Sequence, residues 1–186
     1  MTQLHLKTHD WFALRPIQAQ TLEEARDQFV ELLDEGSECP CCGRYTKRYK
    51  RKLNCGMAWM LIRIFKKCRH SGSRVLHVAD SFLDEKKNAV AQEYSKLRFW
   101  GLLLPVESDD PKVQREQTGS GLWRLTDEGI AFVTGQITVP KHVFLVNGKC
   151  EGFSGDSVTI KQCLGSKFDY DELMDPLILK RSDNNK

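Results

Sequence analysis

The clearest structural pattern in the chain is Leu122-Trp123-Arg124-Leu125-Thr126-Asp127-Glu128-Gly129. Trp123 and Leu125 alternate with their neighbours, as they would on a strand that faces a core with one side. Thr126 is a typical helix N-cap, and the two acids after it are favourable in the first turn of a helix. Gly129 would allow the helix to approach the strand closely. The stretch therefore predicts a strand that runs directly into a helix.

The segments before this stretch predict more helices and strands in a regular order. The pattern indicates a helix over 55–69 capped by Asn54, a short segment over 75–82, a helix over 84–100, a strand over 102–106 and a polar loop over 107–120. From residue 55 to residue 134 the order is therefore helix, short segment, helix, strand, loop, strand, helix.

This order resembles that of the winged helix, which is a helix-turn-helix with an added β-hairpin. Residues 97–103 look like the end of a recognition helix running into the first wing strand, and residues 122–129 look like the second wing strand entering the next helix. Bacterial winged-helix regulators commonly carry a similar aromatic-x-Leu-Thr-x-x-Gly phrase. The resemblance implies that the helix over 84–100 enters the DNA major groove. It also leaves open a protein-binding role, because winged helices serve in both ways.

Two further elements are expected to flank this core. Thr21 and Glu24 have the spacing of a capping box at the start of a helix over 21–34, and Gly36 would end that helix. Asn147-Gly148, within residues 143–153, predicts a β-hairpin, because both residues tolerate the positive φ of a type I′ turn.

The fold class that we expect is α+β. It has a winged helix-turn-helix core with an N-terminal helix, a cysteine knuckle like that of a zinc ribbon, and a C-terminal β-hairpin. The expected segments are an N-terminal helical segment over 1–36, the cysteine knuckle with a basic strand over 37–56, the winged-helix domain over 57–140, and the hairpin with a tail over 141–186.

Positive charge is concentrated in one part of the chain. The net charge is only +3, yet residues 39–79 contain eleven Lys or Arg and no Asp or Glu, which leaves −8 on the remainder. Such a concentration favours an anionic partner, and we expect nucleic acid. The densest part, residues 44–52, has six bases and two tyrosines in nine positions. We expect its cations to contact phosphates: Arg44, Lys47, Arg48, Lys50, Arg51 and Lys52.

The two tyrosines of this segment allow two interpretations. Tyr45 and Tyr49 could stack on unpaired bases, or they could pack against the helix layer while only the bases face outward. We favour packing. On the predicted helix over 84–100, the candidate contacts are Lys86, Lys87 and Lys96. Asp84 and Glu85 at its start would repel phosphate, so we expect this helix to contribute less than the basic segment.

Seven cysteines suggest a metal site. Residues 1–10 lack a basic stretch followed by an apolar one, so we expect no secretory signal, and a reducing compartment favours metal binding or burial over disulfides. Cys39-x2-Cys42-Gly43 resembles half of a zinc ribbon, and Cys55 follows after twelve residues. We therefore expect a structural Zn²⁺ on Cys39, Cys42 and Cys55, with a fourth ligand not identified. The alternative is a thiol-rich turn without metal. Cys41 is expected to be a bystander, and Cys68 to be buried.

Other functional classes lack their signatures. No apolar run reaches the roughly 20 residues that span a bilayer, so we expect a cytoplasmic protein with no membrane partner. The chain has no Walker A loop, no G-x-S-x-G and no H-E-x-x-H, so we expect no enzymatic activity. His77 and Asp80 could imitate a base and its orienting acid, but we expect an ordinary ion pair.

Two functions compete on this basis. The first is a DNA-binding regulator whose ligand is double-stranded DNA. The second is a protein-binding module. The knuckle over 39–54 together with residues 122–129 resembles uncharacterised proteins of phages and mobile elements. Such a protein could block a host defence complex by presenting its basic surface to a nucleic-acid-binding partner. The helix over 21–34 and the C-terminal stretch could support a homodimer or close the core of a monomer.

Overall fold

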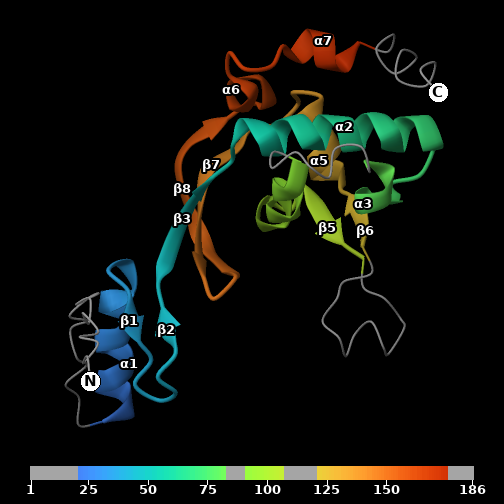
Figure 1. Ribbon diagram of the computed structural model, residues 1–186. Helices are drawn as coiled ribbons and strands as arrows, with labels where there is room; N and C mark the ends of the chain where they lie inside the picture. The colour runs from blue at the N-terminus through green and yellow to red at the C-terminus, as the bar shows by residue number, and fades with distance from the viewer. Residues whose placement is uncertain (1–20, 83–90, 107–120, 176–186) are drawn as a thin grey trace, which may run out of the picture. The chain divides into compact units, whose positions relative to one another are not determined.

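The computed structural model describes residues 21–82, 91–106 and 121–175. These residues form helices and antiparallel sheets, so the fold class is α+β (Figure 1). The chain divides into two compact units. The first contains residues 1–50 and 144–151, and the second contains residues 51–143 and 152–186. The tip of the C-terminal hairpin therefore belongs to the same unit as the N-terminal helix, although the two were expected in separate segments.

The first unit begins with the predicted capped helix. The backbone N–H of Glu24 donates to the Thr21 hydroxyl at 3.2 Å, and the Glu24 carboxylate accepts from the Thr21 N–H at 3.2 Å, which confirms the capping box. Gly36, with φ of 95°, ends the helical segment as expected. The elements are α1 (Leu22–Glu31), η1 (Leu32–Asp34), β1 (Ser37–Glu38) and β2 (Tyr45–Thr46).

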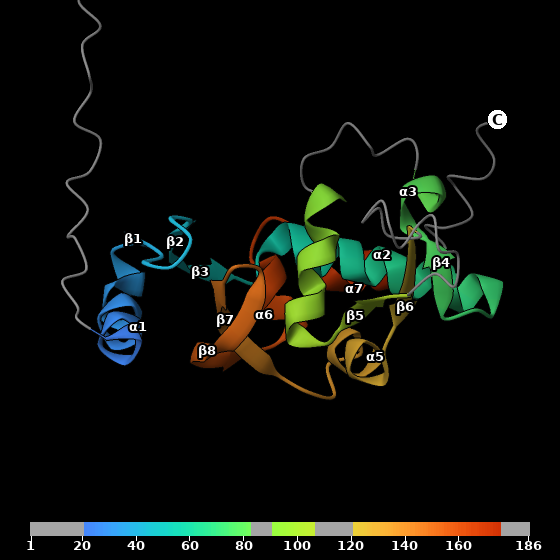
Figure 2. The same ribbon diagram turned by 90° about the horizontal axis from the view of Figure 1, so that it is seen from below.

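The second unit is built around the long helix α2 (Cys55–Ser71). The Asn54 side chain caps it by accepting from the Met57 N–H at 2.9 Å, as the sequence predicted. α2 is buried on both sides: α6 (Ile160–Leu164) and α7 (Tyr170–Met174) cover one side, and a sheet with η3 (Ala91–Trp100) and α5 (Asp127–Val133) covers the other (Figure 1, Figure 2). Among the described residues, α2 therefore contributes more buried apolar side chains to the core of this unit than any other element.

The sheet beneath α2 has the strand order β4-β6-β5 and is antiparallel throughout. Its strands are β4 (Val75–His77), β5 (Leu103–Pro105) and β6 (Leu122–Leu125), and the short helix α3 (Val78–Ser81) follows β4. Trp123 and Leu125 are buried, as the alternation predicted. A Cβ at Gly129 would lie 2.2 Å from the carbonyl oxygen of Leu102, so the expected close approach of helix and strand is confirmed.

The segment before β5 differs from the prediction. An α-helix over 84–100 was expected, but Ala91–Trp100 forms a 3₁₀ helix, and residues 83–90 lie outside the described ranges. The physical reason is packing at a spacing of three, because a 3₁₀ helix places residues i and i+3 on one face. Leu97 and Trp100 are buried, Tyr94 packs edge-on against Trp123 with 5.3 Å between ring centroids, and the Trp100 indole donates to the Pro140 carbonyl at 2.7 Å.

The third sheet has the strand order β3-β7-β8 and consists of β3 (Arg48–Lys52), β7 (Val139–Val146) and β8 (Lys149–Val158). The predicted hairpin is confirmed. Asn147 and Gly148 connect β7 to β8 with φ of 49° and 75°, as a type I′ turn requires. Its strands are longer than the range 143–153 in which the sequence indicated them.

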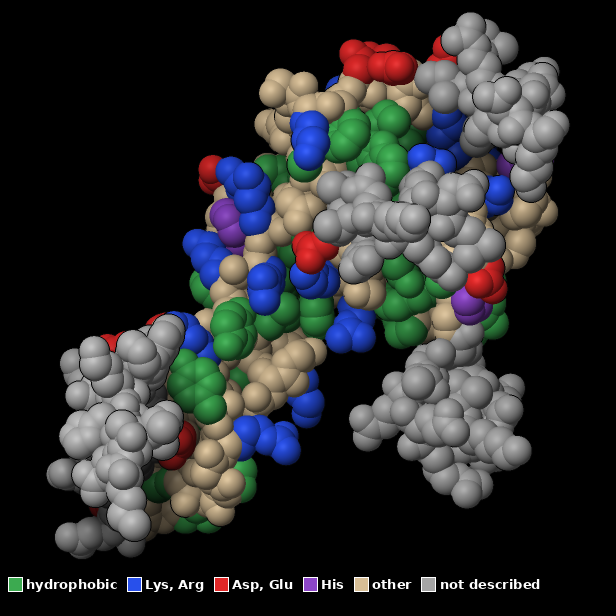
Figure 3. Space-filling view, viewed as in Figure 1, with side chains coloured by type: hydrophobic (Ala, Val, Ile, Leu, Met, Phe, Trp, Pro, Cys, Tyr) green, Lys and Arg blue, Asp and Glu red, His purple; other side chains and the backbone are tan. Residues whose placement is uncertain are grey.

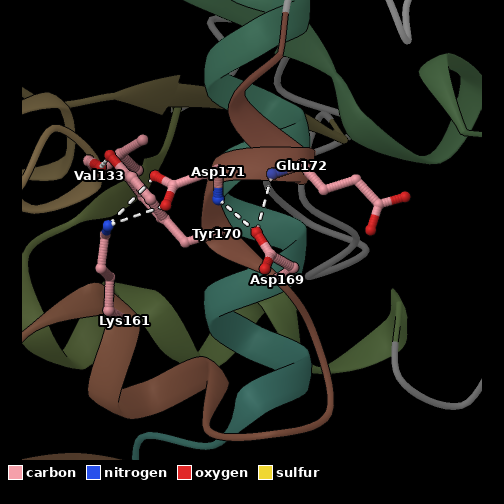
Figure 4. A network of polar contacts seen from close by, with 6 residues as sticks. All are labelled: Val133, Lys161, Asp169, Tyr170, Asp171 and Glu172. Atoms are coloured by element: carbon pink, nitrogen blue, oxygen red, sulfur yellow. Dashed lines mark hydrogen bonds and ion pairs between the residues drawn. The ribbon is translucent and has the colours of Figure 1, made fainter.

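The C-terminal helices are held by a small polar network (Figure 4). The Tyr170 hydroxyl donates to the Val133 carbonyl at 2.7 Å, which ties α7 to the end of α5. Asp169 caps α7, and Lys161 on α6 pairs with Asp171 at 3.1 Å. The network therefore joins three helices of the second unit and has a structural role.

Candidate nucleic-acid interface and cysteine turn

The basic segment runs through β2 and β3, with Arg44 before the two strands and Lys47 between them. Thr46 is buried opposite Ser37, while Tyr45 is paired with Glu38 and exposed. Alternate residues of an extended strand point to opposite faces. The six predicted cations therefore do not form one continuous surface.

The guanidinium of Arg48 is bound by two carboxylates of the first unit. It binds Asp34 at 3.0 Å and Glu151 at 3.2 Å, and these two carboxylates raise the Arg48 pKa by hydrogen bonding. Together with Phe144, the three residues line a shallow hollow of about 220 Å³. Arg48 thus connects η1 to the hairpin tip, a role that no sequence pattern indicated.

Four of the other predicted cations make no ion pair with any described residue: Arg44, Lys50 and Lys52, which are exposed, and Lys47, which is half-buried. Lys50 lies over the Phe144 ring at 5.8 Å from its centroid. Figure 3 shows more Lys and Arg than Asp and Glu side chains over the strands β3, β7 and β8. These four residues are the strongest candidates for phosphate contact.

Lys96 and Arg51 lie near the carboxylate of Glu93. Lys96 forms an ion pair with Glu93, and Glu93 also accepts from the Asn54 side chain at 3.1 Å. The Lys96 hydrogen bond is the main cause that lowers the Glu93 pKa, and the charge of Arg51 adds to it. This cluster joins η3 to the start of α2. Lys86 and Lys87 lie outside the described residues.

The tyrosines are more exposed than expected. Tyr45 is 45% exposed and Tyr49 is 47% exposed, so the expectation that only the basic side chains face outward is wrong. Tyr45 is nevertheless fixed on one side, because a Cβ at Gly36 would lie 2.1 Å from its phenol oxygen. Its ring therefore lies across the Gly36 backbone.

The predicted cysteine knuckle forms a tight turn between β1 and β2. The Cys39 N–H donates to the Arg44 carbonyl at 2.9 Å, and the Gly43 N–H donates to the Cys39 carbonyl at 2.8 Å. Gly43 has φ of 68°, which favours glycine. Backbone N–H groups of Cys41 and Cys42, followed by the Cys42 thiol, donate to the Cys39 sulfur and lower its pKa. The turn thus stabilises a thiolate at Cys39.

The described residues contain no group of three or more His, Cys, Asp or Glu side chains arranged to hold a metal ion. Cys55 is the first residue of α2 and belongs to the second unit. Cys39 and Cys42 share one turn, and a third ligand is not brought to them within the part of the chain that the structure describes. Cys41, expected to be a bystander, lies in the same turn and also hydrogen-bonds to Cys39.

Two other sequence candidates have structural roles. Cys68 is buried on α2 as expected, and burial raises its pKa to about 11. His77 lies at the start of α3, where its Nδ1 is 2.8 Å from the Asp80 carboxylate. Its ring lies against Gly121, where a Cβ would lie 2.0 Å from Nε2.

Comparison of the chain with protein-family models, curated proteins and solved structures gave no significant match. Among the described residues, no helix has both the length and the apolar character that crossing a bilayer would require. A functional proposal for this chain therefore rests on its side chains and their geometry.

Proposed function

We propose that this chain is a nucleic-acid-binding protein of the winged-helix type, a DNA-binding regulator whose ligand is double-stranded DNA. The observation that carries the proposal is a set of cations without an ion pair to described residues: Arg44, Lys50 and Lys52, which are exposed, and Lys47, which is half-buried. Cations placed in this way gain affinity for DNA by releasing counterions from phosphates.

The arrangement of the second unit supports the winged-helix part of the proposal. β5 and β6 pair antiparallel on either side of the predicted wing loop, and β4, which lies between α2 and α3 in the sequence, pairs with β6. A hairpin in this position is what the resemblance requires. The expected recognition helix lies partly outside the described residues, so the phosphate contacts of the basic strand are the part that an experiment tests most directly.

The test is binding of the full chain to a random-sequence duplex over a salt series. The variant Arg44→Gln, Lys47→Gln, Lys50→Gln, Lys52→Gln should bind more weakly, and its slope of log K against log[salt] should fall by about 0.9 for each phosphate that the variant no longer neutralises. The matched control, with the same charge change, is Arg26→Gln, Lys67→Gln, Arg69→Gln, Lys167→Gln, and its slope should stay near that of the wild type. No binding at low salt would overturn the proposal.

A protein partner is the second candidate, and one surface favours it. Leu104 on β5 and Leu122 on β6 are 42% and 36% exposed, and Arg124 on β6 is paired with Leu104. Exposed apolar side chains grouped on a sheet are typical of protein contacts. A phage protein of this kind could block a host defence complex. A complex that itself binds nucleic acid is the expected target, because the basic strand would be presented to its nucleic-acid-binding surface. Binding to such a complex in competition with its DNA, without binding to DNA alone, would support this candidate.

We also propose a structural Zn²⁺ on Cys39 and Cys42, the two thiols that share the turn; Cys55 as a further ligand is the expectation from the sequence alone. The fit rests on the Cys39 sulfur, since N–H groups that stabilise a thiolate also suit a metal-bound sulfur. When bound, the ion would cross-link the turn. A closed zinc site would be structural and not catalytic.

Metal content of the purified chain tests the zinc proposal. Cys39→Ser and Cys42→Ser should each abolish stoichiometric zinc, whereas Cys41→Ser should retain it. Cys55→Ser decides whether the third ligand is the expected one. Zinc at wild-type stoichiometry in the Cys39→Ser, Cys42→Ser double variant would overturn the proposal.

A further inference from the structure

The exposed tyrosines of the first unit add aromatic rings to the basic segment of the proposed function. Tyr45 on β2 and Tyr49 on β3 are about half exposed, and Lys47 lies between them in sequence. We infer that Tyr45, Lys47 and Tyr49 form a binding surface for single-stranded nucleic acid, with the two rings stacking on unpaired bases. This inference rests on the proposed function and names the form of nucleic acid that the first unit takes.

Alternation separates this surface from the groups that hold the unit together. Thr46 is buried, and Arg48 is bound to Asp34 and Glu151. Tyr45, Lys47 and Tyr49 occupy the intervening positions, where the two tyrosines are exposed and Lys47 is half-buried. The segment from β2 to β3 therefore carries two exposed rings on either side of a lysine, between residues that hold the unit together.

The ring of Tyr45 is already fixed in position in the absence of a ligand. β1 and β2 pair Glu38 with Tyr45, and Gly36 lies two residues before Glu38 on the same face. The phenol lies so close to Gly36 that any Cβ there would displace it. Because the ring is already seated, binding would cost little side-chain entropy, and its other side can take a base.

The distance between the two tyrosines suits a single-stranded nucleic acid whose bases are unstacked. Four residues of extended chain separate Tyr45 from Tyr49 by about 13 Å at roughly 3.3 Å per residue. Paired bases inside a duplex do not offer their faces to side chains, whereas unpaired bases stack on aromatic rings irrespective of sequence. Glu38 opposite Tyr45 repels phosphate, so the backbone of the ligand is expected to follow Lys47.

The experiment compares a short fluorescent oligo-thymidine with a duplex of similar length, using the full chain. Tyr45→Ala and Tyr49→Ala should each weaken single-strand binding about 5- to 100-fold and leave duplex binding and the salt slope unchanged. The matched control is the double variant Tyr45→Phe, Tyr49→Phe, which keeps both rings and should bind within about twofold of the wild type, since stacking needs the ring and not the hydroxyl.

A second measurement covers the case in which Tyr45→Ala unfolds the first unit. Photocrosslinking of wild-type protein to an oligonucleotide carrying iodouracil should label Tyr45 or Tyr49. Labels elsewhere, or alanine variants that bind single strands like the wild type, would overturn the inference while leaving duplex binding, and hence the proposed function, intact. Failure of the wild type to bind either nucleic acid would overturn both.

Discussion

At the scale of single residues, neighbouring cations of one strand have different roles. Arg48 is bound to two carboxylates, whereas Lys50 lies over an aromatic ring. Arg48→Gln should lower the free energy of unfolding by about 1 kcal/mol, because the partners are partly exposed, and should leave the salt slope of DNA binding unchanged. Lys50→Gln should leave the free energy of unfolding unchanged and should reduce the salt slope of DNA binding. Urea unfolding and a salt titration of both variants check this, and an equal fall in slope would contradict it.

Gly129 provides a second prediction at this scale. Alanine normally stabilises a helix interior relative to glycine by about 1 kcal/mol. At Gly129 the added Cβ would meet the Leu102 carbonyl oxygen at 2.2 Å and Leu125 Cδ1 at 2.9 Å. Gly129→Ala should therefore destabilise the protein by about 1–3 kcal/mol. Thermal or urea unfolding measures this change in stability, and Glu128→Ala, at an exposed position of the same helix, is the control. A Gly129→Ala variant that is more stable than the wild type would show that the helix can move away from Leu102.

At the scale of elements, the junction between α2 and η3 gives a pH prediction. Lys96 lowers the Glu93 pKa below its ordinary value near 4.5, and Asn54 also donates to Glu93. A lowered folded-state pKa contributes stability above the unfolded-state value, and this stability is lost as the pH falls through the folded-state pKa. Unfolding free energies measured from pH 7 down to acid should fall below about pH 4.5, and less steeply in Glu93→Gln.

The size of this effect is limited by exposure. The Glu93 and Lys96 side chains are 35% and 31% exposed, so solvent screening keeps the contribution below about 1 kcal/mol. Glu128→Gln, at an exposed position, is the control. Identical pH dependence of Glu93→Gln and the wild type would show that the cluster does not contribute to stability.

The helix η3 shows what pattern analysis missed at this scale. Tyr94, Leu97 and Trp100 are three residues apart, a signal that could have indicated a 3₁₀ helix. An α-helix was expected because its spacing also accepts positions three apart. The hydrogen bond from Trp100 to Pro140, forty residues further on, is absent from any local pattern.

At the scale of the whole molecule, the two units differ in the size of their cores. Among the described residues, the buried apolar side chains of the first unit are Ala25, Leu33 and Leu145, and all the others belong to the second. Small cores give marginal stability. Hydrogen exchange should therefore be faster in α1 than in α2 by orders of magnitude. Added zinc should also slow exchange in α1, because the proposed metal would stabilise the cysteine turn of the same unit. Equal protection of the two helices would contradict this prediction.

Local features of this protein could be predicted from its residues alone: the capping box at Thr21, the cap at Asn54, the turn at Asn147-Gly148, the alternation of Trp123 and Leu125, and the tight cysteine turn. Each depends on interactions within a few residues, which spacing reveals. The binding of Arg48 by carboxylates 14 and 103 residues away, and the exposure of the tyrosines, became visible only in the folded chain. Charge and aromatic content are properties of a segment, but the partner of each side chain depends on which distant elements pack against its face of the strand.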